Sequence, residues 1–210
     1  MMEGVSKRPA PPALPFEGQL ELVRPPAPGG LELVRRFLNT YDVQRAREEL
    51  DSPESLAAWL REQDILRAAA AFKPSKADVA RVRRIREELR ALAQRNNGIS
   101  CDCALDALEE ASGRSRFAIA FDGTGSGARL RAQAPGVDGV IGTILAAVHA
   151  SMADKTWPRL KACADETCGW AYYDHSKNGC SRWCSADTCG NRSKVKRYRE
   201  RQASLATNPA

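Results

Sequence analysis

The stretch "KACADETCGWAYYDHSKNGCSRWCSADTCG", residues 161–190, holds five of the seven cysteines of this 210-residue chain. Four of them form two pairs, with four residues inside each pair and 15 residues between the pairs: Cys163 with Cys168, and Cys184 with Cys189. Two short thiolate loops at this spacing are typical of a tetrahedral zinc site, because each pair closes one side of the metal. The intervening Asn178-Gly179 turn can fold the second pair back onto the first. The stretch therefore predicts one structural Zn²⁺ bound by these four thiolates.

Two other residues of the stretch are alternative ligands. Cys180 lies four residues before Cys184 and could pair with it, and His175 could supply a nitrogen. The equal loops favour Cys184 with Cys189. The simplest alternative is that the cysteines are scattered buried thiols without a metal. This alternative is weaker, because the segment has too few apolar residues to fold without a cross-link such as a bound metal. A spare Cys180 would be a candidate redox thiol whose oxidation releases the zinc.

Two expectations follow from a four-cysteine site. Four protein ligands leave no position for an activated water, so we expect a structural metal and no catalytic residues or enzyme activity. We also expect that removal of the metal unfolds residues 160–200 and leaves the rest of the chain folded, because zinc supplies about 10–16 kcal/mol to such modules.

A run of basic residues follows the last cysteine. Residues 177–201 include eight basic and two acidic side chains, so this window alone carries the +6 net charge of the whole chain. The sequence after Cys189 has no proline before Pro209 and is rich in helix-forming residues. Its Val195 and Tyr198 lie on one side of a helix and are expected to pack against the zinc module. The sequence thus predicts a basic helix for nucleic acid, contacted by Arg182, Arg192, Lys194, Lys196, Arg197, Arg199 and Arg201.

Other partners fit the same charge. An acidic protein, or no partner at all, would explain it without nucleic acid. An RNA-binding module is a further alternative, because four aromatic residues of the stretch could stack on unpaired bases: Trp170, Tyr172, Tyr173 and Trp183. We favour the simpler interpretation that these four side chains form a small core of the zinc module.

The residues before the zinc module predict a mostly helical body. Residues 1–30 hold seven of the twelve prolines, which is typical of a disordered lead-in. Ser52 and Ser75 are expected to cap two helices, the second with a capping box to Asp78. The arginines of that second helix are expected on a solvated face: Arg81, Arg83, Arg84, Arg86 and Arg90. A β-hairpin is predicted at about 115–133, with one buried face of alternating Phe117, Ile119 and Phe121.

These segments predict an α+β fold. A mostly α-helical domain with one hairpin spans 31–158, a zinc module with its basic helix spans 159–203, and 204–210 is a tail. No stretch approaches the roughly 18 uncharged apolar residues of a membrane span, and the N-terminus lacks the apolar run of a secretory signal. We therefore expect a cytoplasmic protein without a membrane partner. His149, in the apolar segment 137–153, is expected to be a structural or surface histidine.

The motif Cys189-Gly190-Asn191-Arg192 and its flanks resemble the CGNR zinc finger family. The shared features are the aromatic run 170–173, the pattern "D-x-S-x-N" at 174–178 and "RWCS" at 182–185. Upstream, "LELVRRFLNT" and "DSPESLAAWL" are similar to the ABATE domain that precedes this finger, with Arg35 and Arg36 in place of more typical residues. The resemblance covers about residues 30–202. It implies the same four zinc ligands and a bacterial, stress-related transcription regulator whose finger binds DNA. We add the hypothesis that the N-terminal domain senses a small-molecule or protein signal.

Overall fold

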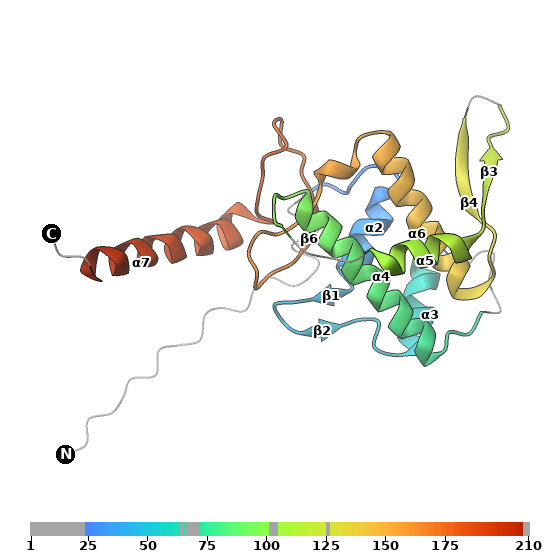
Figure 1. Cartoon of the computed structure of the whole chain (residues 1–210), viewed down its shortest axis with the longest axis horizontal. Coiled ribbons are helices and arrows are strands. Elements are labelled where there is room, and N and C mark those ends of the chain that lie inside the picture. The colour runs from blue at the N-terminus through green and yellow to red at the C-terminus, as the bar shows by residue number, and fades with distance from the viewer. Residues whose placement is uncertain (1–23, 64, 66–71, 101–104, 125–126, 208–210) are drawn as a thin grey trace, which may run out of the picture.

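The computed structural model describes residues 24–63, 65, 72–100, 105–124 and 127–207 (Figure 1). The helices are α2 (Leu31–Leu38), α3 (Pro53–Glu62), α4 (Lys76–Arg95), α5 (Asp106–Ser115), α6 (Gly136–Ala153) and α7 (Asn191–Thr207), with a 3-10 turn η2 (Trp157–Arg159) and a π-helical turn η3 (Ala186–Gly190). Described strands pair into three antiparallel two-stranded sheets: β1 (Tyr41–Asp42) with β2 (Arg47–Glu48), β3 (Phe117–Phe121) with β4 (Ala128–Ala132), and β5 (Leu160–Ala162) with β6 (Ala171–Tyr173). The predicted α+β fold, with a helical body and a C-terminal cysteine module ending in a helix, is confirmed.

Local sequence signals start two of the helices as predicted. Ser52 accepts a hydrogen bond from the backbone N–H of Ser55, and Pro53 occupies the first helical position of α3. Ser75 caps α4, and the Asp78 carboxylate reaches back to the Ser75 N–H at 2.8 Å, which completes the predicted capping box. Both caps satisfy N–H groups that the first helical turn leaves without partners.

The apolar core lies between α2, α3, α4, α5 and α6. Its fully buried side chains include Val34, Leu56, Leu89 and Ile144, one from each of four helices. The short sheet β5–β6 extends the same core, because Leu160, Ala162, Ala171 and Tyr173 belong to this cluster. The segments that flank β5 and β6 are therefore anchored directly to the hydrophobic core of the body.

Two arginines of α4 correct the prediction of a solvated face. Arg86 and Arg90 are only 2% and 5% exposed. Arg86 donates to both carboxylate oxygens of Glu48 at 2.7 Å, and Arg90 donates to the Gly169 carbonyl at 2.6 Å. Burial alone would raise the pKa of Glu48, but the hydrogen bonds and charge of Arg86 lower it. The guanidinium groups are buried because α4 packs on its polar side against β1–β2 and the cysteine module.

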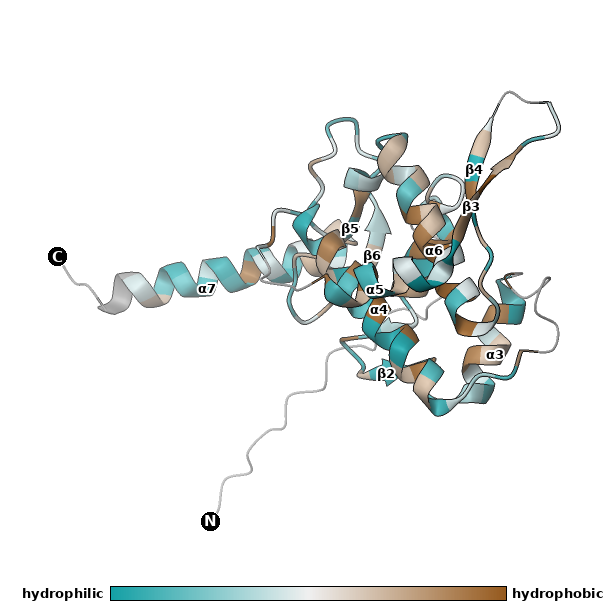
Figure 2. Ribbon diagram, turned by 45° about the vertical axis from the view of Figure 1, so that its right-hand side comes forward, coloured by the Kyte–Doolittle hydropathy of each residue, from teal (hydrophilic) through white to brown (hydrophobic). Residues whose placement is uncertain are grey.

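The hairpin β3–β4 is present where the sequence predicts it, but its apolar face is not buried. The register pairs Ile119 with Leu130 and Phe121 with Ala128. Ile119 is 65% exposed and Phe121 is 74% exposed, so the predicted burial of this face is wrong for these two side chains. The reason is geometric: α6 supports the base of the hairpin through Gly142, whose α-carbon faces Ala132, while the strands project beyond the body (Figures 1 and 2).

By length and composition, α6 could span a membrane, a criterion that core helices of globular proteins also meet. It has 18 residues with Asp138 as the only one of Asp, Glu, Lys or Arg, closer to a membrane span than we expected from the sequence. One side of α6 is buried in the core, including Val140, Ile144 and Val148. His149 is exposed.

The predicted lead-in, residues 1–30, is described only from Arg24 onward. Ala27 is buried in the core, and Arg24 donates to the carbonyl oxygens of Cys184 at 2.7 Å and Trp183 at 2.8 Å. Its guanidinium also lies 4.5 Å from the ring centroid of Tyr172. The last residues of this segment thus form an ordered strap across the cysteine module. Cys101 and Cys103 lie outside the described residues.

Candidate metal centre and the basic helix

The structure brings the four cysteines of the two predicted pairs together. The Sγ atoms of Cys163, Cys168, Cys184 and Cys189 all lie within 4.8 Å of one another, and all four residues are buried. Sγ of Cys184 is 3.6 Å from Sγ of both Cys168 and Cys189. A tetrahedral site with Zn–S bonds of about 2.3 Å has sulfurs about 3.8 Å apart. The donor set and its spacing therefore fit one structural Zn²⁺.

Backbone pairing places the first two of these cysteines. Cys163 directly follows β5, and its N–H donates to the Trp170 carbonyl at 2.9 Å, which continues the β5–β6 ladder. Cys168 lies on the turn that returns to β6. That turn needs Gly169, because its φ is +60° and a β-carbon would lie 2.8 Å from Val43.

The other two cysteines are placed by the segment that follows β6. The Ala164 N–H donates to the Arg182 carbonyl at 3.0 Å, which holds Cys184 beside the first pair. Cys189 lies in η3, whose Ser185 side chain accepts from the Thr188 N–H as an N-cap. Both pairs of thiols thus belong to short, hydrogen-bonded loops, as the sequence predicts.

The four thiols cannot all ionise at this separation without a cation. Hydrogen bonds from Cys163 and the other two thiols, together with the charge of Arg192, lower the pKa of Cys189 below its usual range. The corresponding bonds, again led by Cys163, raise the pKa of Cys184. One thiolate forms at the expense of its neighbours, because like charges this close repel. A divalent cation removes the conflict.

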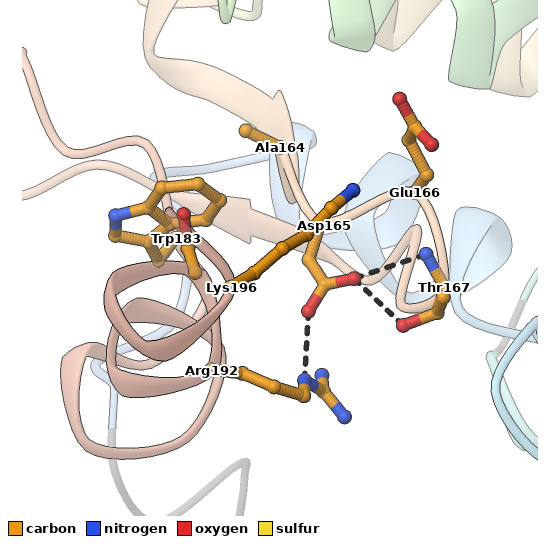
Figure 3. A pocket seen from close by; sticks show the side chains of 8 residues that line it. Ala164, Asp165, Glu166, Thr167, Trp183, Arg192 and Lys196 are labelled. Carbon is orange, nitrogen blue, oxygen red and sulfur yellow. Dashed lines mark hydrogen bonds and ion pairs between the residues drawn. The ribbon is translucent and has the colours of Figure 1, made fainter. Parts of the chain in front are cut away.

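Arg192 bridges the two halves of the centre. Its Nε donates to the Asp165 carboxylate at 2.8 Å, and its Nη2 donates to Cys189 Sγ at 3.1 Å. The Asp165 carboxylate also accepts from the N–H and hydroxyl of Thr167, so the bridge ends on the loop between Cys163 and Cys168 (Figure 3). Burial would lower the pKa of Arg192, but the charges of Cys189 and Asp165 raise it. The sequence predicted Arg192 as a nucleic-acid contact, whereas its guanidinium is already used within the module.

The alternative ligands do not join the cluster. Cys180 is exposed, and the group of potential ligands found among the described residues contains neither Cys180 nor His175. His175 is exposed, with its ring 4.8 Å from that of Tyr173 and its Nε2 3.1 Å from the Pro25 carbonyl. The role of Cys180 as a redox thiol stays a prediction.

The aromatic residues proposed as base-stacking platforms are mostly inside the protein. Trp170, Tyr172 and Tyr173 are buried, which contradicts the stacking alternative for all three and agrees with the favoured interpretation of a small aromatic core in the zinc module. Tyr172 donates its hydroxyl to the Ser181 carbonyl at 2.7 Å, and Tyr173 belongs to the apolar core. Trp183 is half-buried and lines an open pocket of about 220 Å³ beside Arg192 and Lys196 (Figure 3).

A buried ion pair organises the loop between the two cysteine pairs. Lys161 Nζ donates to Asp174 at 2.9 Å and also to the carbonyl of Gly179. Burial alone would raise the pKa of Asp174, but hydrogen bonds from Ser176 and Lys161, with the charge of Lys161, lower it to about 2. This carboxylate also accepts from the Ser181 N–H at 2.9 Å. The pair thereby fixes the reversal that the Asn178-Gly179 sequence predicts.

Side chains of the body bind the cysteine module at four points that sequence patterns did not reveal. Arg90 donates to Gly169, as described above. Asn39 donates to the Ala171 carbonyl at 2.9 Å and accepts from the Ala171 N–H at 2.8 Å. Asn97 donates to the carbonyls of Ala162 at 2.7 Å and Arg182 at 2.9 Å, and Asn96 donates to that of Leu160 at 2.8 Å. The module is therefore attached to the body by hydrogen bonds as well as by β5–β6.

The basic helix is α7, which leaves the module directly after Cys189 and extends away from the body (Figure 1). Five of its basic side chains are exposed: Lys194, Lys196, Arg197, Arg199 and Arg201. None of these five forms an ion pair or hydrogen bond within the described part of the chain, and the sixth, Arg192, is bound as described above. Arg182 precedes the helix and is exposed, and its guanidinium carbon lies 5.9 Å from the centroid of the Trp183 ring.

The expected packing of α7 on the zinc module is wrong. Val195 and Tyr198 are exposed, because α7 contacts mainly the preceding η3 turn, with Arg192 reaching Asp165, before it projects into solvent. The helix is mainly hydrophilic along its length (Figure 2). Nothing in the described part of the chain therefore covers any side of its outer turns.

Two families match separate parts of this chain. Residues 31–155 match the family described as ABATE, "Putative stress-induced transcription regulator", and residues 159–202 match the CGNR zinc finger. No curated protein matches the chain. The first match spans the helical body with its hairpin, and the second spans the cysteine module and most of α7.

Proposed function

Because the chain belongs to the ABATE family and carries a CGNR zinc finger, we propose that it is a cytoplasmic transcription regulator that binds duplex DNA through α7. The observation that carries this proposal is the state of the α7 charges. Five basic side chains of α7 project into solvent without a partner in the described part of the chain, whereas several arginines of the body are paired with acidic side chains such as Glu32, Glu48 and Glu87. Unpaired cations on one projecting helix fit a partner with closely spaced negative charges, such as the DNA backbone.

In this proposal the zinc centre has a positioning role. Bound Zn²⁺ would supply rigidity by linking the two cysteine loops, with all four positions taken by protein, so we propose no enzymatic activity for it. Arg192 ties the first turn of α7 to Asp165 and Cys189, which fixes the direction of the helix. We therefore assign the phosphate contacts to the five free side chains of α7 and to Arg182, and give Arg192 a positioning role.

Duplex DNA is favoured over single-stranded RNA by the burial of the aromatic residues. Recognition of unpaired bases depends on exposed aromatic platforms. Trp170, Tyr172 and Tyr173 are committed to the interior, so only Trp183 has a partly free ring. The cationic helix α7 has Tyr198 as its single exposed aromatic side chain, so it is suited to phosphate contacts more than to the stacking of several bases.

The body would act as the sensor of a small-molecule or protein signal. The support for this part of the proposal is the set of direct contacts from α2 and α4 to the module. Asn39, Arg90 and Asn97 bind backbone atoms beside Cys163 and Cys168. A signal that shifts these helices would therefore move the base of α7.

The test measures DNA affinity as a function of salt. Fluorescence anisotropy of a labelled duplex should show log Kd rising with log salt, with a slope of about 5 if the five side chains of α7 and Arg182 all reach phosphates. The double variant Lys196→Gln/Arg199→Gln should lower that slope by about 2, while zinc content stays unchanged. The matched control Arg61→Gln/Lys76→Gln removes two exposed charges from the body and should leave the slope as it is.

Two results would contradict the proposal. One is a lack of binding to any duplex at low salt by the zinc-loaded protein. The other is competition in which single-stranded RNA displaces the duplex far more effectively than unlabelled duplex does, which would favour the RNA alternative.

A further inference from the structure

The apolar face of the hairpin β3–β4 is a surface that the DNA-binding proposal does not use. Alternation along the strands and the register place Ile119, Phe121, Ala128 and Leu130 on one face. Ile119 and Phe121 are the two most exposed of the large hydrophobic residues described. A two-stranded hairpin is marginal in water by itself, and a cluster of exposed large apolar side chains usually marks an interaction site.

The neighbouring face of α6 is also apolar and uncovered. A helix that is apolar on all sides is normally buried on all sides. Here one side of α6 is buried in the core, whereas Ala150, Met152 and Ala153 are exposed. Between this side of α6 and the hairpin lies an open groove of about 600 Å³, lined by Ile119, Ala128 and Leu130 on one wall and by His149, Ala150 and Ala153 on the other.

We infer that this face binds a second copy of the chain, with Phe121 of each copy entering the groove of the other. In a two-fold interface the same patch of each copy meets its counterpart on the other copy. One patch must therefore contain both members of every pair of contacting residues. This patch does so, because the projecting Phe121 lies directly opposite Ala128, which lines the groove. This surface carries both a projecting apolar side chain and an adjoining apolar groove, so two copies of it can fit each other.

The charges at the groove favour the same occupant. Arg129 lies on the hairpin wall and Asp154 lies at the end of α6 on the opposite wall. Neither forms an ion pair within the described part of the chain, and the Asp154 carboxylate accepts only from Thr156. A two-fold axis through the groove places Arg129 of each copy toward Asp154 of the other. A lipid surface would leave Asp154 without a partner at the same place.

This dimer does not depend on what α7 binds. The hairpin and α7 lie at opposite ends of the long axis of the molecule (Figure 1). Pairing through the hairpins therefore leaves both α7 helices free at the two ends of the assembly.

The test measures the mass of the full-length, zinc-loaded chain by sedimentation velocity across a range of micromolar concentrations. The wild type should be a dimer that dissociates on dilution. Phe121→Lys should raise the dimer Kd by about 30-fold or more, since it places a charge in a desolvated contact. Because Phe121 is exposed in the monomer, the thermal melting of Phe121→Lys should match that of the wild type at concentrations at which both are monomeric. Tyr198→Lys, which changes an equally exposed aromatic side chain on α7, should keep the wild-type Kd.

A charge exchange tests the two-fold arrangement itself. Arg129→Glu and Asp154→Lys should each weaken the dimer, and the double variant should recover most of the affinity. A wild type that is monomeric at every concentration, or a Phe121→Lys variant with unchanged Kd, overturns the inference. So does co-flotation of the wild type, but not of Phe121→Lys, with vesicles of neutral and anionic phospholipid, which would assign the face to a membrane. A double variant no tighter than the single ones would overturn the pairing of Arg129 with Asp154.

Discussion

The apolar core of the body and the zinc-centred cluster, which consists of Cys163, Cys168, Trp170, Tyr172, Cys184 and Cys189, are stabilised by different forces. Among the residues that the structure describes, the core contains 26 buried side chains, and each large one contributes about 1.5–3 kcal/mol through burial. The zinc-centred cluster contains six, and four of them are cysteines. The cluster lacks the apolar area to fold alone, so the metal and the polar contacts from the body must supply the difference.

The two regions are joined mainly by hydrogen bonds, although the interior of each region is mainly apolar. Asn39, Arg90 and Asn97 satisfy backbone groups of the module that water would otherwise have to satisfy. A buried donor that loses its acceptor costs about 1–3 kcal/mol. The two regions should therefore unfold as one unit, although their internal forces differ. Three changes of decreasing energetic effect test that coupling: removal of the metal, loss of a buried arginine, and loss of a buried carboxylate.

Removal of the metal should have the largest effect. Structural zinc contributes about 10–16 kcal/mol to modules of this kind, and without it no divalent cation links the two cysteine loops. Because β5–β6 belongs to the apolar core, chelation should lower the melting temperature of the body as well, in contrast to the behaviour expected from the sequence alone. Circular dichroism at 222 nm, which follows the helices of the body, is the measurement.

Hydrogen exchange in the same experiment distinguishes coupled unfolding of the two regions from independent unfolding. If the regions are coupled, chelation removes protection from residues 160–204 and also lowers it at the contacting ends of α2 and α4. Two separate transitions, with a body that melts at its original temperature, would show that the regions are independent.

Arg90 should give the next largest effect. Arg90→Met keeps most of the side-chain volume but removes the donors to the carbonyls of Gly169 and Leu38, both of which are buried contacts. We expect a loss of about 3 kcal/mol in the free energy of unfolding in urea, and faster transfer of zinc to a colorimetric chelator.

The control for Arg90 lies on the same helix. Arg84 is exposed and pairs only with Glu88, one turn away, so Arg84→Met should change the stability by no more than about 0.5 kcal/mol. If Arg90→Met lowers stability but leaves the rate of zinc transfer unchanged, Arg90 stabilises the body without coupling it to the module.

The metal site could be predicted from sequence because its signal is local. Two pairs of cysteines at equal spacing define the ligands, and Ser52, Ser75 and Asp78 define helix starts within four residues of themselves. The sequence signal for the hairpin is also local, because its two strands are adjacent in the chain and are joined by a single turn. All these features depend on side chains that act on their own neighbourhood in the chain.

The remaining features depend on contacts between distant segments. Arg86 and Arg90 follow the spacing of a solvated face, and only the position of Glu48 and Gly169 shows that they are buried. Asn96-Asn97-Gly98 has the sequence of a helix stop, yet both asparagines also bind the module more than 60 residues away. Exposure of Phe121 could not be predicted either, because alternation identifies an apolar face but not what covers it.

The smallest of the three effects should come from Asp174, whose ion pair with Lys161 lies inside the module. The pKa of Asp174 falls from 3.8 in the unfolded chain to about 2 in the folded one, which corresponds to about 2 kcal/mol of stability. Because the folded pKa is the lower one, this contribution is fully present above pH 4 and is lost as the pH falls through about 2.

Asp174→Asn should therefore destabilise the protein by about 2 kcal/mol at neutral pH, as measured by urea unfolding, and the difference from the wild type should shrink only below pH 4. The comparison uses only pH values at which metal analysis shows that both proteins hold zinc, because the module unfolds once its thiolates are protonated and the zinc is lost. Glu166→Gln, at an exposed position between the first two cysteines, should show no such difference. A gap between wild type and Asp174→Asn that closes well above pH 4, while both proteins still hold zinc, would mean that Lys161 does not lower the pKa of Asp174. The loop from 174 to 181 would then be held mainly by the bonds of Lys161 to Gly179 and Ser181.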